Sequence, residues 1–328
     1  MRYYFLAAII LAIVAFLSRY LLEELDLQSF IVANVFRVVV YNLYPSKHFN
    51  LNLPEQPILS TIHHQDISLR NESNVFIRIY AKNFSSDFKK PVLLFIHGGG
   101  FAVGDVPGNN DICSSLADLT DSIIVSVSYR LAPEYKFPAA LEDVRDSLIW
   151  IEHNIEFFGG SKEKVAIMGE SAGGNLAASA IAMNIDQPYI SLTLRHAYLI
   201  YPCIEQGSIR ESVFKNRNTN GLLTEIQMHY FWSLYLNDVN ERNDYRACPI
   251  LTPNDFLAKF PPTTLVLAKH DTLFDEGFEF GRRLSANGVH VDFDVYNSTI
   301  HGFFGRFGPG AAALKKTAQS FRHALYEE

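Results

Sequence analysis

The run Gly169-Glu170-Ser171-Ala172-Gly173 constrains this chain more than any other stretch. A short apolar run, Val165–Met168, leads into it, and small helix-forming residues follow at once. A serine on so sharp a strand-to-helix turn has strained backbone angles, and the flanking glycines remove side chains that would collide with it. The amides that begin the following helix favour negative charge there. The pattern predicts a nucleophilic serine; the alternative is a glycine-rich turn with an incidental serine.

Three consecutive glycines stand in His97-Gly98-Gly99-Gly100, directly after the apolar run Val92–Ile96. Glycines expose backbone N–H groups without obstruction, and such groups stabilise the oxyanion of acyl transfer. A dinucleotide-binding loop is a competing interpretation, but its last glycine would fall at Val103. No Gly-Lys-Ser or Gly-Lys-Thr follows, which excludes a P-loop. An oxyanion loop is the functional interpretation, and a plain β-turn is the structural alternative.

A nucleophilic serine needs a base, and the base needs a carboxylate to orient it. Asp271 and His301 each follow a predicted strand, so both are expected at the same edge of the sheet as Ser171. The chain order serine, aspartate, histidine is that of α/β-hydrolases. Asp275 is the rival acid, but its position is typical of the first turn of a helix. Asp271 is therefore the preferred carboxylate.

Apolar runs and turn residues predict a hairpin followed by alternating strands and helices. This pattern is typical of a mostly parallel sheet with helices on both faces. The predicted fold class is α/β, an α/β-hydrolase fold with about eight strands and a helical cap. The predicted strands are 66–70, 75–80, 92–96, 123–128, 165–168, 197–201, 264–268 and 291–296. The predicted helices are 110–119, 139–157, 171–182, 276–287 and 311–326.

The chain divides into three predicted parts. Residues 65–328 are expected to form the catalytic domain, interrupted at about 204–250 by a polar loop and one helix over 224–236. This insertion is interpreted as a cap, because it would lie at the carboxyl ends of the strands, where ligands bind. Residues 23–64 are expected to form a helical cap segment that covers the active site or touches a membrane surface; ordinary core helices are the alternative. Residues 1–22 form the third part.

The segment 1–22 is apolar or aromatic without interruption from Tyr3 to Leu17. About 20 helical residues span roughly 30 Å, the thickness of the hydrocarbon layer of a membrane. We expect a transmembrane signal anchor; a cleaved signal peptide and a buried helix are the alternatives, and no small-residue cleavage site follows the run. Arg2 precedes the segment and acidic residues follow it, so the positive-inside tendency places the catalytic domain on the lumenal side.

Charge and cysteine usage limit the remaining function classes. The formal net charge is −7 and no basic block occurs, which argues against nucleic acid as a partner. Three cysteines allow one disulfide at most and show no Cys-x-x-Cys spacing, so no zinc site is predicted and the pairing stays open. The cysteines are Cys113, Cys203 and Cys248, and glycosylation sequons begin at Asn71, Asn83 and Asn297.

Four motifs, in order, resemble those of the hormone-sensitive-lipase-like group of α/β-hydrolases, and within it the arylacetamide deacetylase and neutral cholesterol ester hydrolase relatives. They are HGGG at 97–100, YRLAPE at 129–134, GESAGGN at 169–175 and DTLFDEG at 271–277. The resemblance extends from about residue 90 to the C-terminus. The region between Ile204 and Pro261 looks shorter than in those relatives, which leaves the size of the substrate open.

The resemblance implies a role for each site residue. Ser171 would be the nucleophile, His301 the general base and then acid, and Asp271 the group that holds the imidazole tautomer. The 129–134 motif would brace the oxyanion loop. No cofactor and no metal are implied. The oxyanion hole would consist of three backbone N–H groups, those of Gly98, Gly99 and Ala172.

We therefore expect a cofactor-free serine hydrolase that cleaves small apolar esters, or aryl amides, through an acyl-Ser171 intermediate. A lipase for long-chain lipid esters is one alternative, and a non-catalytic receptor on the same fold is another. The relatives are typically type II membrane proteins of the endoplasmic reticulum with a lumenal hydrolase domain. The same localisation is expected for this chain, with the N-terminal helix in the membrane; secretion after signal cleavage is the alternative.

Overall fold

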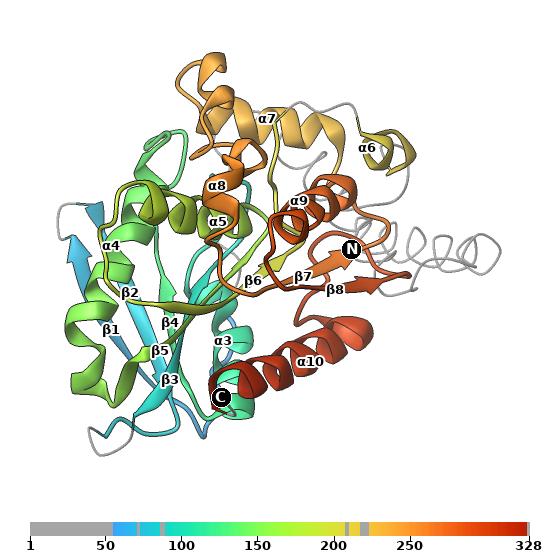
Figure 1. Ribbon diagram of the computed structural model, residues 1–328. Coiled ribbons are helices and arrows are strands. Elements are labelled where there is room, and N and C mark those ends of the chain that lie inside the picture. Colours follow the sequence, from blue (N-terminus) through green and yellow to red (C-terminus); the bar gives the residue numbers. More distant parts are fainter. Residues whose placement is uncertain (1–54, 71–72, 86–88, 207–209, 217–222, 327–328) are drawn as a thin grey trace, which may run out of the picture.

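A single sheet of eight strands runs through the centre of the protein, with helices on both faces and short helices beyond one edge (Figure 1). The strand order is β1-β2-β4-β3-β5-β6-β7-β8. The predicted fold class, an α/β-hydrolase fold with a mostly parallel sheet of eight strands, is confirmed. The structure is a computed structural model, and it describes residues 55–70, 73–85, 89–206, 210–216 and 223–326.

The sheet begins with an antiparallel hairpin and continues as a parallel sheet. The strands are β1 (His63–Arg70), β2 (Val75–Ala81), β3 (Lys90–Ile96), β4 (Ile123–Val127), β5 (Gly160–Glu170), β6 (Leu194–Ile200), β7 (Thr263–Ala268) and β8 (Val291–Tyr296). β2 pairs antiparallel with β1 and β4, and every pairing from β3–β4 to β7–β8 is parallel. β4 and β7 are buried along their whole length. Strands covered on both faces need apolar residues at successive positions, which explains their unbroken apolar runs.

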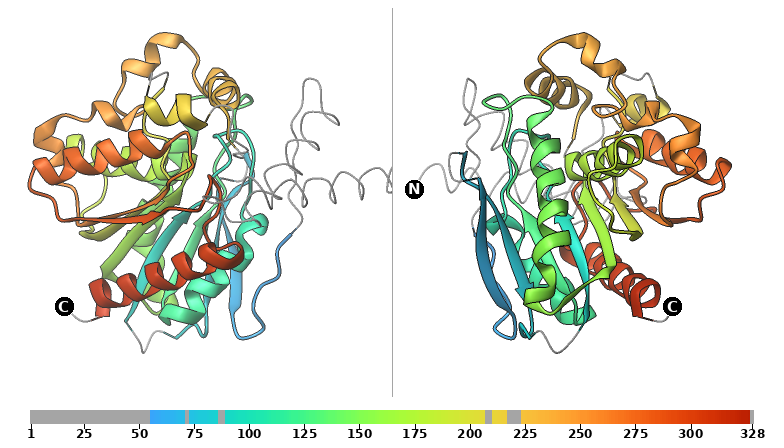
Figure 2. Two further views of the ribbon diagram at one scale, coloured as in Figure 1. Left: turned by 90° about the vertical axis from the view of Figure 1, so that its right-hand side faces the viewer. Right: turned by 60° about the vertical axis from the view of Figure 1, so that its left-hand side comes forward.

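Helices cover the two faces of the sheet in two separate apolar cores. α3 (Asn110–Thr120) and α10 (Phe307–Tyr326) pack on one face, and α4 (Ala139–Asn154), α5 (Ala172–Asp186) and α9 (Phe274–Ala286) pack on the other (Figure 2). Successive residues of β3 alternate between the cores: Leu93 faces the core of α3 and α10, and Leu94 faces the other. Each fully buried leucine of this kind contributes about 2 kcal/mol to stability.

The parallel strands place the functional residues at one edge of the sheet. Ser171 follows β5, Asp271 lies three residues beyond the end of β7, and His301 lies five residues beyond the end of β8. The glycine run that starts at Gly98 follows β3. Because parallel strands share their direction, these four loops meet at the carboxyl edge, where ligands bind in open α/β sheets.

The described residues of the region 204–250, where a cap was expected, lie beyond this edge (Figure 1). One helix was expected there, and α7 (Glu225–Tyr235) is that helix. Its N-terminus carries a capping box, in which the Thr224 side chain accepts from the Gln227 N–H and the Gln227 side chain accepts from the Thr224 N–H. Three short elements were not predicted, because none is long enough to show a helical period. They are α6 (Glu211–Asn216) and two 3-10 helices, Val239–Asn243 and Pro249–Leu251. A short helix α8 (Asn254–Leu257) follows.

The N-terminal predictions fall largely outside the described residues, which begin at residue 55. The expected anchor, 1–22, lies wholly outside them. Only the last residues of the expected helical segment 23–64 are described, and residues 55–64 contain no helix; β1 begins at His63. Pro57 disfavours a helical conformation at the preceding residue. No helix in the described ranges combines the length and apolar character needed to span a bilayer.

Candidate active site

Ser171 sits on a sharp turn between β5 and α5. Its backbone has φ 55° and ψ −118°, a combination that residues other than glycine rarely adopt. The neighbouring glycines allow the turn, because a Cβ at Gly169 would lie 2.1 Å from the Gly173 carbonyl oxygen. A Cβ at Gly173 would lie equally close, 2.1 Å, to the carbonyl oxygen of Ile96 on β3. The two glycines of the motif are therefore required by packing, and the serine is held 9% exposed at the edge of the sheet.

The three side chains expected to act together form one hydrogen-bonded row. His301 Nε2 lies 2.9 Å from Ser171 Oγ, and His301 Nδ1 lies 2.7 Å from Asp271 Oδ2. The Asp271 carboxylate can only accept, so Nδ1–H donates to it and Nε2 is left to accept from the serine hydroxyl. Asp271 is 1% exposed, and its other carboxylate oxygen accepts from the Leu273 N–H at 2.9 Å. The row has the geometry needed for transfer of the serine proton to the imidazole.

The rival carboxylate, Asp275, lies apart from this row. It lies in the first turn of α9, and its carboxylate accepts from the Ser212 N–H of α6 at 2.6 Å. Of the two carboxylates, Asp271 is the one that the structure places in hydrogen-bond contact with His301.

The glycine run beside Ser171 leaves no room for side chains. A Cβ at Gly98 would lie 3.2 Å from the Cβ of Ser171, and one at Gly99, where φ is +120°, would lie 2.0 Å from the Val103 carbonyl oxygen. Ala172 follows the serine as the first residue of α5. The structure thus brings Gly98 and the start of α5, two of the positions expected to supply oxyanion donors, next to the serine.

Comparison with known proteins agrees with this geometry. Residues 93–305 match the alpha/beta hydrolase fold family, a stretch that covers most of β3, all of β4 to β8, the glycine run and all three side chains of the row. The chain belongs to the hormone-sensitive-lipase-like α/β-hydrolases. The family predicted from the four motifs is therefore confirmed.

Relatives within the α/β-hydrolase family are esterases and deacetylases. The chain is 31% identical to the esterase LipI of Mycobacterium tuberculosis over 271 residues, 81% of this chain and 82% of that protein. It is 28% identical to arylacetamide deacetylase of Oryctolagus cuniculus over 288 residues, 70% of this chain and 72% of that protein. A solved esterase structure from Pyrobaculum calidifontis superimposes with a TM-score of 0.75 at 30% identity, covering 90% of this chain and 91% of that one.

The predicted localisation in the membrane of the endoplasmic reticulum is wrong as an inference from the family. The relatives include an esterase of a bacterium, an organism without that compartment, so membership of the family does not imply it. The described residues supply no membrane-spanning helix in its support. The resemblance to arylacetamide deacetylase predicted the fold and the family correctly, but it did not predict the location.

The loop at 97–100, the expected oxyanion loop of this α/β-hydrolase, packs on the ring of Tyr129. The imidazole of His97 lies on the Tyr129 ring with centroids 4.2 Å apart and planes inclined by 15°. The Tyr129 hydroxyl donates to the His97 carbonyl oxygen at 3.0 Å. Burial lowers the pKa of His97 to about 4, so the ring is neutral at physiological pH. The Nδ1 atom of this ring lies 2.7 Å from the Gly98 carbonyl oxygen. The 129–134 motif thus braces the loop, as the resemblance implied.

α7 contacts the glycine run and Phe101 through aromatic side chains that no sequence pattern indicated. A Cβ at Gly100 would lie 2.3 Å from the Phe231 ring of α7. The Phe101 ring stacks on Tyr235 of the same helix, with centroids 3.8 Å apart, and lies 5.4 Å from the Trp232 ring. Phe101 has φ +63°, unusual for a bulky side chain. Spacing alone shows no such contact, because the loop and α7 are far apart in the chain.

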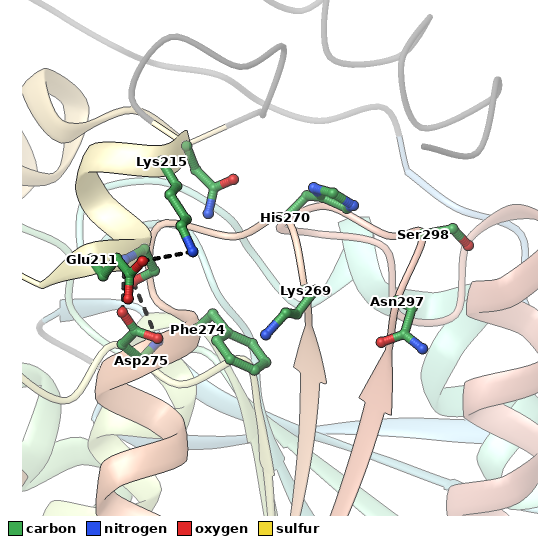
Figure 3. Close-up of a pocket in the computed structure, with 10 residues that line it drawn as sticks. Glu211, Lys215, Lys269, His270, Phe274, Asp275, Asn297 and Ser298 are labelled. Carbon is green, nitrogen blue, oxygen red and sulfur yellow. Dashed lines mark hydrogen bonds and ion pairs between the residues drawn. The ribbon is translucent and has the colours of Figure 1, made fainter. Parts of the chain in front are cut away.

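A pocket of about 710 Å³ lies beyond Asp271, at the carboxyl ends of β7 and β8 (Figure 3). Its walls include Lys269 and His270 after β7, Asn297 and Ser298 after β8, and the starts of α6 and α9. Neither Ser171 nor His301 lines it. The pocket is joined to the row of three side chains through α6, since the Asn216 amide donates to the Asp271 carbonyl oxygen at 3.0 Å.

The three cysteines are free and buried. The sequence left their pairing open, and the structure pairs none of them. Burial raises the pKa of Cys248 to about 12, so this thiol is neutral and not reactive at physiological pH. Within the described ranges no group of three or more histidine, cysteine, aspartate or glutamate side chains could hold a metal ion.

Proposed function

We propose that this carboxylic ester hydrolase cleaves its substrates through an acyl-Ser171 intermediate, with His301 and Asp271 completing the triad. One observation carries the proposal: the unbroken row from Ser171 Oγ to His301 at 2.9 Å and from His301 to Asp271 at 2.7 Å. Homologous esterases of the same family support the reaction class. The buried carboxylate holds the imidazole in the tautomer that can accept a proton.

In the proposed mechanism the hydroxyl of Ser171 attacks the ester carbonyl while His301 takes its proton. The carbonyl oxygen becomes negative and accepts hydrogen bonds from the N–H groups of Gly98, Gly99 and Ala172. His301 then returns the proton to the leaving alcohol, and the acyl group stays on the serine. A water molecule, deprotonated by the same imidazole, releases the acid and restores the hydroxyl.

We infer that the substrate is a small apolar ester, with aryl amides as a further class. The ring of Phe231, which lies 2.3 Å from a Cβ placed at Gly100, makes the neighbourhood of the expected oxyanion loop apolar. An aromatic wall of this kind favours an apolar acyl or alcohol group. Arylacetamide deacetylase, by its name, acts on aryl amides, which supports the second class.

Replacement of Ser171 tests the proposal. Purified Ser171→Ala should fold with an unchanged far-ultraviolet spectrum and lose both hydrolysis of p-nitrophenyl acetate and labelling by a fluorophosphonate. Retention of wild-type hydrolysis by the folded variant would exclude the mechanism. A series of p-nitrophenyl esters from acetate to palmitate should peak at short chains; a peak at palmitate would assign the protein to lipases instead.

A further inference from the structure

Tyr201 stands between the serine turn and the loop that carries His301. It directly follows β6 and is 2% exposed. Its backbone has φ +33°, and its N–H donates to the Val266 carbonyl oxygen of β7 at 2.7 Å. The end of the sheet therefore fixes the direction in which this side chain leaves the backbone.

The side chain of Tyr201 contacts two segments that must stay in register for the reaction. It donates to Glu170 Oε2 at 2.6 Å, and Glu170 is the residue immediately before Ser171. Phe303 and Phe304, two and three residues after His301, are buried in the same apolar core as Tyr201. One buried tyrosine, through its hydroxyl and its ring, thus connects the serine turn with the histidine loop.

The ring of Tyr201 lies against the imidazole itself. The two ring centroids are 4.7 Å apart with planes inclined by 57°, and the Phe303 ring lies 5.7 Å away on the histidine loop. A ring in this position blocks rotation of the imidazole on that side. It also offers an aromatic surface to the imidazolium that forms during the reaction.

Glu170, which accepts the hydrogen bond from Tyr201, lies next to Gly98 of the glycine run. The Glu170 side chain is 7% exposed, and its Cγ would lie 3.4 Å from a Cβ placed at Gly98. A buried carboxylate needs hydrogen-bond donors, and the phenol supplies one of the short, charge-assisted kind. The residue between Gly169 and Ser171 is thus tied to the rest of the site through Tyr201.

We propose that Tyr201, held by Glu170, is a positioning residue that keeps the imidazole of His301 in line with Ser171. The inference rests on the proposed serine-hydrolase mechanism and extends it. Loss of alignment by about 1 Å at a reacting group can lower a rate about a hundredfold, so a hydroxyl that fixes the ring lying against His301 affects catalysis without touching substrate.

The test is the kinetics of Tyr201→Phe, which keeps the ring and removes only the hydroxyl. We expect kcat for p-nitrophenyl acetate to fall about tenfold, with KM within twofold of wild type, because the imidazole is misaligned while the substrate pocket is intact. The rate of fluorophosphonate labelling should fall in parallel, since it reports activation of Ser171.

Tyr198→Phe is the matched control. Tyr198 lies on β6, three residues before Tyr201, is buried, and has a hydroxyl 3.4 Å from Ser320 Oγ of α10. This variant should keep kcat within twofold. A Tyr201→Phe protein with kcat within twofold of wild type, or a tenfold loss in both variants, would overturn the inference.

Glu170 variants supply a second test should Tyr201→Phe fold poorly. Glu170→Gln keeps an oxygen that accepts from the phenol and should retain kcat within about threefold, whereas Glu170→Ala should lose about tenfold. Equal losses in the two variants would contradict the positioning role. Failure of the mechanism itself is recognised separately, by hydrolysis and labelling that survive in Ser171→Ala.

Discussion

The two sides of Ser171 are held in different ways. On one side the oxyanion loop rests on rings: His97 on Tyr129 below it, and Phe101 on Tyr235 of the cap above. On the other side the ring of Tyr201 also lies against His301, but the loops after β7 and β8 are linked to each other by a hydrogen bond, the contact of 2.7 Å between His301 and Asp271.

The difference follows from what each side has to present. An oxyanion hole needs bare N–H groups, and a polar side chain nearby would compete for them, so packing by uncharged rings suits it. The side that transfers protons needs charged and polar groups, and these must be hydrogen-bonded when they are buried. Variants of each kind test the comparison.

The largest effect is expected on the hydrogen-bonded side. Asp271→Asn should lower kcat about ten-thousandfold, because an amide in place of the carboxylate favours the imidazole tautomer that cannot accept the serine proton. Steady-state hydrolysis of p-nitrophenyl acetate measures it. Asp275→Asn, which alters the rival carboxylate at the start of α9, should change kcat less than threefold. Similar losses in both variants would show that the two carboxylates share the role.

The next largest effect is expected in the oxyanion loop. Gly99→Ala places a Cβ 2.0 Å from the Val103 carbonyl oxygen at φ +120°, so the loop must shift. Loss of oxyanion donors costs about 3 kcal/mol each, so kcat should fall a hundredfold or more.

Gly288→Ala is the control for this substitution. Gly288 also has a positive φ, +87°, but a Cβ there meets nothing within 4 Å. The control should lose about 1 kcal/mol of stability in urea unfolding and keep its activity. An active Gly99→Ala enzyme would place the oxyanion hole elsewhere.

A smaller effect is expected from the ring support beneath the loop. Tyr129→Phe keeps the stack on His97 and removes only the hydroxyl that donates to the His97 carbonyl oxygen at 3.0 Å. One neutral hydrogen bond is worth about 1 kcal/mol, so kcat/KM should fall about fivefold or less. A fall above a hundredfold would mean that the hydrogen bond, and not the stacked rings, holds the oxyanion side.

The smallest effect concerns stability on the hydrogen-bonded side. Glu276 of α9 is fully buried, and burial raises its pKa to about 8 although its Oε1 accepts from the N–H groups of Ile204 and Glu205. Because the pKa is higher in the folded state, the fold binds a proton that the unfolded chain has released. Stability should therefore decrease as pH rises from about 4.5 through about 8.

Glu276→Gln checks this dependence. Its amide keeps one accepting oxygen and cannot ionise, so its melting temperature should decrease less between pH 6 and pH 9 than that of wild type, by about 2–4 °C. Thermal melts followed by circular dichroism at both pH values measure the difference. Parallel decreases in the two proteins would assign the pH dependence to another group.

Much of this architecture was predictable from the local sequence. β8 begins and ends at the predicted residues, and the capping box at Thr224 marks the start of α7 within one residue of the prediction. Long periodic or continuous apolar segments, such as those that form β7 and α9, carry their own structural signal. The short helix α6 does not, although it holds the Asp271 loop through Asn216, because six residues show no period.

The sequence by itself determined the family, the fold and the three side chains on which the proposed mechanism depends, because the glycine-flanked serine and the strand-end positions are local patterns with few physical solutions. Only the tertiary structure decided what surrounds them: the stack of Phe101 on Tyr235, the link from Glu170 through Tyr201 to the histidine loop, and the pocket beside Asp271. These contacts join residues from distant parts of the chain, and no local spacing records which distant segments meet when the sheet and the cap pack together.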